Sequence, residues 1–198
     1  MPILPANHDV RDESVNAMAK RYGVDQRHAA AVERTALKIL DQSGKAWSLE
    51  PNFSAMFLRW AARLHEIGLA ISHASYHKHG EYILKNCDLQ GFSQTDQKLL
   101  AALVRVHRGK FALMSFDGLP TIWVEPMRRL AVIFRLAVLL HRSRTPDLKP
   151  PLKVTANRRQ LEIRFTQKTW LQRHPLTQAD LEREADYLKA IEVRLKLA

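Results

Sequence analysis

Histidines and one glutamate are the side chains of this sequence best suited to metal-dependent chemistry. Nine histidines occur among 198 residues, and several of them fall near the start or the end of a predicted helix. Imidazole nitrogens and carboxylate oxygens hold divalent metal ions, and a metal-bound water can attack a phosphate ester. If this chain binds a metal, the candidate ligands are His28, His65, Glu66, His73 and His77.

The order of these residues resembles that of the HD-domain metallophosphohydrolases. In that superfamily an early helix supplies a histidine and a later one ends in Leu-His-Asp-Ile-Gly, which this chain matches at residues 64–68 with Glu66 in place of the aspartate. The late helix of the superfamily carries Ala-Asp-x-Leu-Asp, whereas residues 137–141 here read Ala-Val-Leu-Leu-His. Because Val138 cannot bind a metal, the interpretation as a catalytic HD enzyme is considerably weakened, and we predict no metal or other cofactor in this chain.

A structural role for these histidines is therefore the favoured interpretation. His65 and Glu66 can cap and hydrogen-bond a helix end, while the others lie on the surface. His73 and His77 are four residues apart and would share one face if their segment is helical. That spacing is compatible with chelation, but equally with two solvated side chains.

The second chemical feature is an excess of positive charge. Lys and Arg total 31 against 20 Asp and Glu, which gives a formal charge of +11 and a pI near 10.1. Such a surplus favours a polyanionic partner, and the planar guanidinium fork suits phosphate oxygens. The candidate phosphate contacts are Arg59, Arg63, Lys78, Arg105, Arg108, Lys110, Arg128, Arg129 and Arg135.

Spacing and context distinguish some of these cations. Arg105 and Arg108 are three residues apart and Arg128 and Arg135 are seven apart, so each pair can share a helix face. Arg135 lies between Phe134 and Leu136 in an apolar helix. We therefore expect Arg135 to have a specific partner, which could equally be an internal carboxylate such as Glu66.

Apolar periodicity predicts that helices position these residues. The expected fold is mainly α, an HD-domain-like helical bundle over residues 1–145, followed by a small α+β domain over 146–198. Residues 152–165 alternate around Asn157-Arg158-Arg159, which is typical of a β-hairpin. Asp25 and Ser93 are the expected N-caps of two helices. The remaining helix bounds follow: 9–22, 25–41, 53–66, a helix through 82–84, one through 99–106, 127–141 and, after Thr177, 178–197.

Cysteine usage and hydropathy indicate the cellular compartment. Cys87 is the single cysteine, so no internal disulfide forms, and the longest apolar stretch, residues 130–140, is interrupted by Arg135. The N-terminus has too short an apolar run for a signal peptide. We expect a soluble cytoplasmic protein without a membrane partner.

An ordered series of blocks carries a narrower resemblance. They are Leu58-Arg59-Trp60-Ala61-Ala62-Arg63-Leu64-His65-Glu66-Ile67-Gly68, then Tyr76-His77-Lys78-His79-Gly80-Glu81-Tyr82, and later Leu103-Val104-Arg105-Val106-His107-Arg108. Together they resemble the C-terminal half of the exopolyphosphatase / guanosine pentaphosphate phosphohydrolase (Ppx/GppA) family, over nearly the whole chain.

The resemblance implies both a role and an absence. In the family, an actin-like N-terminal half with glycine-rich phosphate loops performs catalysis, for which Mg²⁺ would be expected, and this chain has no such loop. The C-terminal half is associated with dimerisation and with holding long polyphosphate. The resemblance therefore implies a non-catalytic homodimeric module that holds polyphosphate or guanosine pentaphosphate. Whether the chain is a fragment or stands alone stays open.

Two alternatives remain beside this interpretation. The first is an independent metal-dependent HD-type phosphohydrolase, motivated by His28, His65 and Glu66 and opposed by Val138. The second is a nucleic-acid-binding protein, which the charge alone supports. No helix-turn-helix, zinc-finger or RNA-recognition signature accompanies that charge, so we rank it last.

Overall fold

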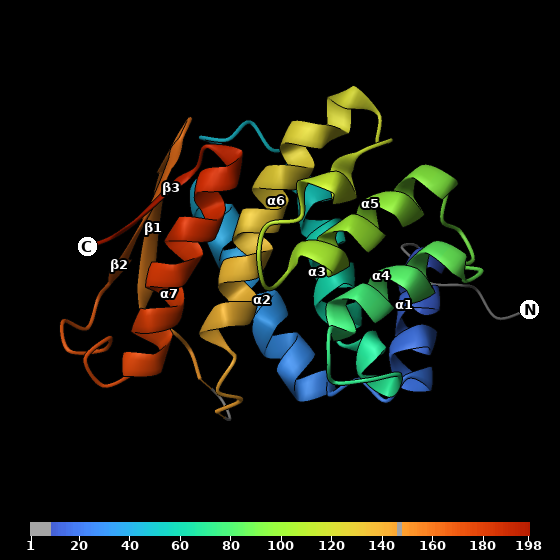
Figure 1. Cartoon of the computed structure of the whole chain (residues 1–198), viewed down its shortest axis with the longest axis horizontal. Helices are drawn as coiled ribbons and strands as arrows, with labels where there is room; N and C mark the ends of the chain where they lie inside the picture. The colour runs from blue at the N-terminus through green and yellow to red at the C-terminus, as the bar shows by residue number, and fades with distance from the viewer. Residues whose placement is uncertain (1–8, 146–147) are drawn as a thin grey trace, which may run out of the picture.

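Helices make up most of the protein in a computed structural model that describes residues 9–145 and 148–198 (Figure 1). The prediction of a mainly helical chain is confirmed. The α-helices are α1 (Val10–Arg21), α2 (Gln26–Ser43), α3 (Pro51–Leu64), α4 (Tyr76–Asn86), α5 (Gln94–Val106), α6 (Thr121–Leu140) and α7 (Pro175–Leu188), and short 3-10 helices are η1 (Ile67–Ala70), η2 (Leu113–Phe116) and η3 (Lys189–Ile191).

Local capping fixes where two of these helices begin. The Asp25 carboxylate accepts hydrogen bonds from the backbone N–H groups of Arg27 and His28, which starts α2. The Ser93 hydroxyl accepts from the Asp96 N–H at 3.0 Å and donates to the Asp96 carboxylate at 2.9 Å, which starts α5. Both predicted N-caps are confirmed, because each side chain satisfies N–H groups that have no partner inside the helix.

The hydrophobic core lies where α3, α5 and α6 meet, with α2 packed against α3 and α6. Trp60, Phe57 and Phe134 are fully buried there. Burying each such side chain stabilises the fold by about 1.5–3 kcal/mol. This core places the end of α3 between the start of α2 and the end of α5, so the centre of the His65 ring lies 5.6 Å from that of His28 and 5.3 Å from that of His107.

The start of α6 differs from the prediction. The helix begins at Thr121, not at Met127, and Pro126 lies inside it. A proline at that position removes a hydrogen bond to the carbonyl four residues earlier, at Ile122. Ile122 is exposed, so water can satisfy that carbonyl and the helix continues through the proline. Among the described helices, α6 included, none is long and apolar enough to cross a membrane.

The chain after residue 148 forms a small sheet. Strands β1 (Leu152–Asn157) and β2 (Gln160–Phe165) pair antiparallel, as predicted for the hairpin. The prediction of one helix over 178–197 is wrong at its end, because α7 stops at Leu188 and β3 (Arg194–Leu197) pairs parallel to β2. Glu192 takes a left-handed conformation with φ 56° and reverses the chain. Alternation in Val193-Arg194-Leu195-Lys196-Leu197 then buries Val193 and Leu195, a period that a strand fits and a helix does not.

The sheet and α7 pack against the helical body at one end of the molecule, beside α6 and α2 (Figure 1). Hydrogen bonds connect the sheet to the helical body: the Trp47 indole donates to the Asn157 carbonyl at 2.7 Å, and the Val154 N–H donates to the Gln42 side chain at 2.7 Å. The division into domains at residue 145 stays a prediction.

Candidate functional site

Three of the predicted metal ligands lie together at the junction of α2, α3 and η1. His28 is in the first turn of α2, His65 caps the end of α3, and Glu66 follows it. One ligand atom from each lies within 4.8 Å of the other two. The Glu66 Oε1 atom is 3.8 Å from His28 Nε2 and 3.9 Å from His65 Nε2. We call these three residues the His-Glu cluster.

Burial keeps the imidazoles of the cluster neutral. Burial lowers the pKa of His65 to about 4 and also lowers the pKa of His28, although the nearby Glu66 carboxylate opposes both shifts. His65 Nδ1 is 2.8 Å from the Ala62 carbonyl, so this nitrogen carries the proton and donates it. The lone pair of His65 Nε2 therefore points into the cluster, and among the described residues this atom has no hydrogen-bond partner.

The Arg144 guanidinium covers the open side of the cluster. Its Nη2 donates to Glu66 Oε1, and its Nη1 lies 3.3 Å from Asp25 Oδ2 at the start of α2. Arg144 has a left-handed backbone with φ 52°, which places its side chain over α2 after α6 has ended. Sequence analysis missed Arg144, because the basic segment beyond His141 resembles a linker in composition.

Arg135 has its internal carboxylate, but the partner is Glu184 of α7 and not Glu66. The guanidinium is 1% exposed and contacts both Glu184 oxygens, one of them at 2.7 Å. It also donates to the carbonyls of Val106 and Gly109. Most of its donors are engaged inside the protein, so Arg135 would have to leave these partners to bind an external phosphate, and its assignment as a phosphate contact stays a prediction.

His73 and His77 do not join the His-Glu cluster. Helix α4 begins at Tyr76, so His73 lies outside it and the two histidines do not share a helical face. His77 instead lines a pocket, where burial lowers its pKa to about 4 and the positive charges of Arg105 and Arg108 add to the shift. The chelating pair that the four-residue spacing would have allowed is therefore not formed.

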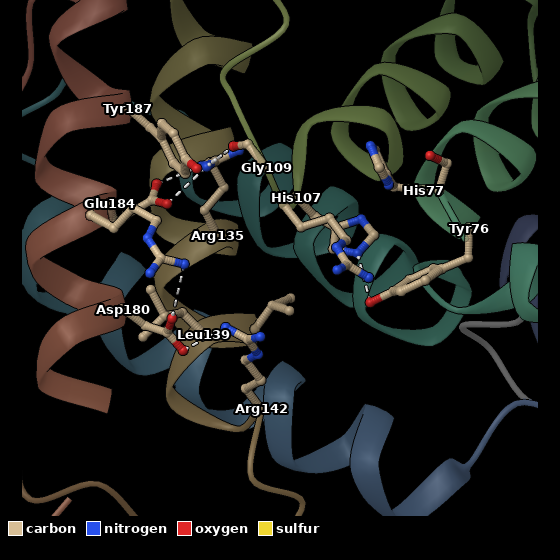
Figure 2. Close-up of a pocket in the computed structure, with 14 residues that line it drawn as sticks. Tyr76, His77, His107, Gly109, Arg135, Leu139, Arg142, Asp180, Glu184 and Tyr187 are labelled. Atoms are coloured by element: carbon tan, nitrogen blue, oxygen red, sulfur yellow. Dashed lines mark hydrogen bonds and ion pairs between the residues drawn. The ribbon is translucent and has the colours of Figure 1, made fainter. Parts of the chain in front are cut away.

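That pocket, of about 450 Å³, lies between the start of α4, the end of α5, α6 and α7 (Figure 2). Tyr76 and His107 form one wall, joined by a hydrogen bond of 3.3 Å between the phenol and His107 Nε2. Asp180 on α7 holds Arg142 at 2.7 Å on the opposite side. Val138, the residue that replaces an expected metal ligand, is half-buried and lines the same pocket. The pocket also contains Arg183, which sequence analysis did not single out.

The remaining candidate cations differ in their availability. Several have carboxylate partners: Arg59 and Arg63 contact Glu33, Arg105 contacts Glu81, and Arg129 contacts Glu125. Arg128 lies over the Phe116 ring. Within residues 9–145 and 148–198, no carboxylate pairs with Lys78, Arg108 or Lys110, which are exposed at the start of α4 and just after α5. We call these three residues the basic rim.

His141 predicts how stability depends on pH. Burial lowers its pKa to about 4 from 6.5, and its Nε2 is hydrogen bonded to Thr35 Oγ1 at 2.7 Å. The unfolded chain takes up this proton first as the pH falls, so stability is full above about pH 6.5, declines toward pH 4 and levels off below it. Between pH 7 and pH 4.5 the wild type should lose roughly 1–2 kcal/mol more of its free energy of unfolding than His141→Gln does. The difference is smaller than the full effect of the pKa shift, because solvent screens part of it.

Urea unfolding of both proteins at the two pH values measures this difference. The other buried histidines are common to both proteins and cancel in the comparison. Equal losses in the wild type and in His141→Gln would contradict the assignment.

Comparison with known protein sequences identifies relatives of this chain. Residues 10–185 match the profile described as Ppx/GppA phosphatase, domain III. The chain is 34% identical over 179 residues to a guanosine-5'-triphosphate,3'-diphosphate pyrophosphatase of Pseudoalteromonas translucida, covering 90% of this chain and 36% of that protein. It is 33% identical over 186 residues to the protein of that name from Aeromonas hydrophila, covering 93% and 37%. The chain thus spans little more than a third of the length of these relatives.

Proposed function

Because this chain belongs to the Ppx/GppA phosphatase family and corresponds to its domain III, we propose that it is a polyphosphate-binding and dimerisation module without a catalytic centre of its own. The family match carries this proposal. Charge supports it, because a surplus of +11 attracts a polyanion and releases its counterions on binding. Guanosine pentaphosphate carries the same phosphate chemistry on a shorter chain.

The basic rim is the surface at which we expect the phosphates to bind. Lys78, Arg108 and Lys110 are exposed, and their charges are not neutralised by described carboxylates, so they can meet an anion without first losing a partner. The Arg108 guanidinium lies 4.6 Å from the centre of the Tyr76 ring, which restricts its motion while leaving its edge toward solvent. A preordered guanidinium loses less entropy when it binds phosphate.

The binding experiment compares long polyphosphate with the wild-type chain and a rim variant. The affinity of the wild type should fall linearly on a log–log plot as salt rises. Arg108→Gln/Lys110→Gln should bind roughly tenfold more weakly at low salt and show a shallower salt slope. The matched control is Lys153→Gln/Lys168→Gln, which removes the same charge from exposed lysines of β1 and the segment after β2.

Four results separate the parts of this proposal. A lack of binding at low salt would refute the polyphosphate role, and equal losses in both double variants would show that net charge alone, not the rim, attracts the anion. Sedimentation of the chain tests the homodimer independently. Measurable polyphosphate hydrolysis by the purified chain would contradict the absence of a catalytic centre.

The second candidate, an independent metal-dependent phosphohydrolase, is favoured by the His-Glu cluster. A divalent ion held there would supply an activated water. His28, His65 and Glu66 fit such an ion in donor type, whereas Val138 offers no further ligand. A hydrolysis screen with phosphate monoesters, phosphodiesters and nucleotides distinguishes the candidates, because turnover that is lost in His28→Gln would favour the enzyme.

A further inference from the structure

The donor set of the His-Glu cluster selects a particular class of ion. It offers two imidazole nitrogens and one carboxylate oxygen. Ions such as Zn²⁺ and Co²⁺ accept this mixture, whereas Mg²⁺ and Ca²⁺ prefer sites made of oxygen atoms. Three protein ligands also leave a position open for water. The chemistry of the donors therefore fits a borderline divalent ion.

The geometry is close to what one ion requires. Donor atoms bound at about 2.1 Å around a tetrahedral ion lie about 3.4 Å from one another. Glu66 Oε1 is 3.8 Å and 3.9 Å from the two imidazole nitrogens, so small rotations of the side chains would close the site. The ring centres of His28 and His65 are 5.6 Å apart, which leaves both Nε2 atoms facing the same carboxylate.

One buried atom points independently to a ligand. His65 is fully buried, and its Nε2 has no hydrogen-bond partner among the described residues. Buried polar atoms are rarely left unpaired, and such an atom calls for an explanation. The bond from Nδ1 to the Ala62 carbonyl fixes the tautomer that leaves Nε2 free, which is the outer-shell arrangement of a metal-binding histidine.

Arg144 binds the same Glu66 oxygen that lies within 4 Å of both imidazoles. Its guanidinium binds Glu66 Oε1, the atom from which the distances to His28 and His65 are measured. The Arg144 side chain is 45% exposed and lines a pocket of about 630 Å³ together with His28 and His141. Moving this side chain toward solvent would open an access path to the cluster.

We propose that His28, His65 and Glu66 form a binding site for one Zn²⁺-like ion, which Arg144 closes because its guanidinium and the ion require the same carboxylate oxygen. The site needs no turnover and is independent of phosphate binding at the basic rim. In this arrangement, the arginine supplies the positive charge beside Glu66 whenever the ion is absent. Metal affinity is therefore set by the competition between ion and guanidinium.

Titration with Co²⁺ tests this competition, because bound Co²⁺ has a visible absorption that reports ligand type and geometry. Arg144→Ala should bind one equivalent at least about tenfold more tightly than the wild type. Arg142→Ala is the matched control, since Arg142 lies in the same segment, is exposed and pairs with Asp180 instead. It should bind Co²⁺ as the wild type does.

Two further variants locate the ion. In the Arg144→Ala background, His28→Gln and the isosteric Glu66→Gln should each abolish the Co²⁺ absorption, while circular dichroism confirms that the helices remain. Bound Zn²⁺ should also raise the unfolding temperature of Arg144→Ala and leave that of the His28→Gln derivative unchanged. Folded Arg144→Ala that binds no Co²⁺ at millimolar concentration would overturn the proposal, as would Co²⁺ binding that survives both ligand substitutions.

Discussion

Replacing Arg135 with methionine should lower the free energy of unfolding by about 3–5 kcal/mol. The substitution leaves the Glu184 carboxylate buried without its cation and removes the donors to the Val106 and Gly109 carbonyls. Breaking one side of a buried pair costs far more than the pair itself contributes, because the remaining charge stays desolvated. Urea denaturation of the wild type and the variant measures the difference.

The double variant Arg135→Met/Glu184→Leu should recover much of that stability, since apolar groups of similar volume can replace a buried ion pair. The matched control is Lys189→Ala, which breaks an exposed pair with Asp186 whose side chains are 75% and 69% exposed. That variant should show no measurable change. Near-wild-type stability of Arg135→Met would show that this ion pair does not hold α7 against α6.

Gly68→Ala should destabilise the chain by at least about 3 kcal/mol or prevent folding, because the backbone of α4 lies directly against this glycine. A Cβ atom there would meet the Tyr76 carbonyl oxygen at 2.0 Å and the Gly80 nitrogen at 2.6 Å. Both contacts are with backbone, so only a displacement of α4 could relieve them. That displacement would also move Tyr76 away from His107.

Substitutions at two other glycines should cost less stability, because their surroundings leave more room for a side chain. In Gly80→Ala the new Cβ would lie 2.8 Å from Val104 Cγ1, a side-chain atom that can shift, so a loss of about 1–2 kcal/mol is expected. Gly23 has φ +64° and open space around it, so Gly23→Asn should cost about 1 kcal/mol or less. Thermal unfolding of the three proteins gives the order. An equal cost for Gly68→Ala and Gly23→Asn would exclude a steric cause.

Much of the fold follows from local patterns in the sequence. Apolar spacing predicted the helices, side-chain caps at Asp25 and Ser93 predicted two of their starts, and alternation predicted the hairpin. The patterns gave the wrong helix bounds where the local sequence is compatible with two secondary structures. Pro126 is a typical helix start, yet the chain before it is helical, and residues 191–197 carry both a helical stripe and an alternating one. These residues form a strand because they pair with the edge of β2, which lies about 30 residues earlier in the chain.

The candidate site was likewise predicted in part from the sequence. Residue types identified five candidate ligands, and the structure brings His28, His65 and Glu66 together while His73 and His77 lie elsewhere. The position of Arg144 beside Glu66 depended on a backbone with positive φ beyond the end of α6, for which its neighbours in the chain give no signal. The choice of Glu184 as the partner of Arg135 depended on how α7 packs against α6.

By itself, the sequence determined the helical class, the family resemblance, the charge surplus and the chemical types of the candidate ligands, because these depend on composition and on neighbours along the chain. Only the tertiary structure decided which cations remain available, which imidazole nitrogen lacks a partner and which arginine lies on Glu66. Pairing of charges depends on distances of a few ångströms between residues 49 to 78 positions apart, and packing of the whole core sets those distances.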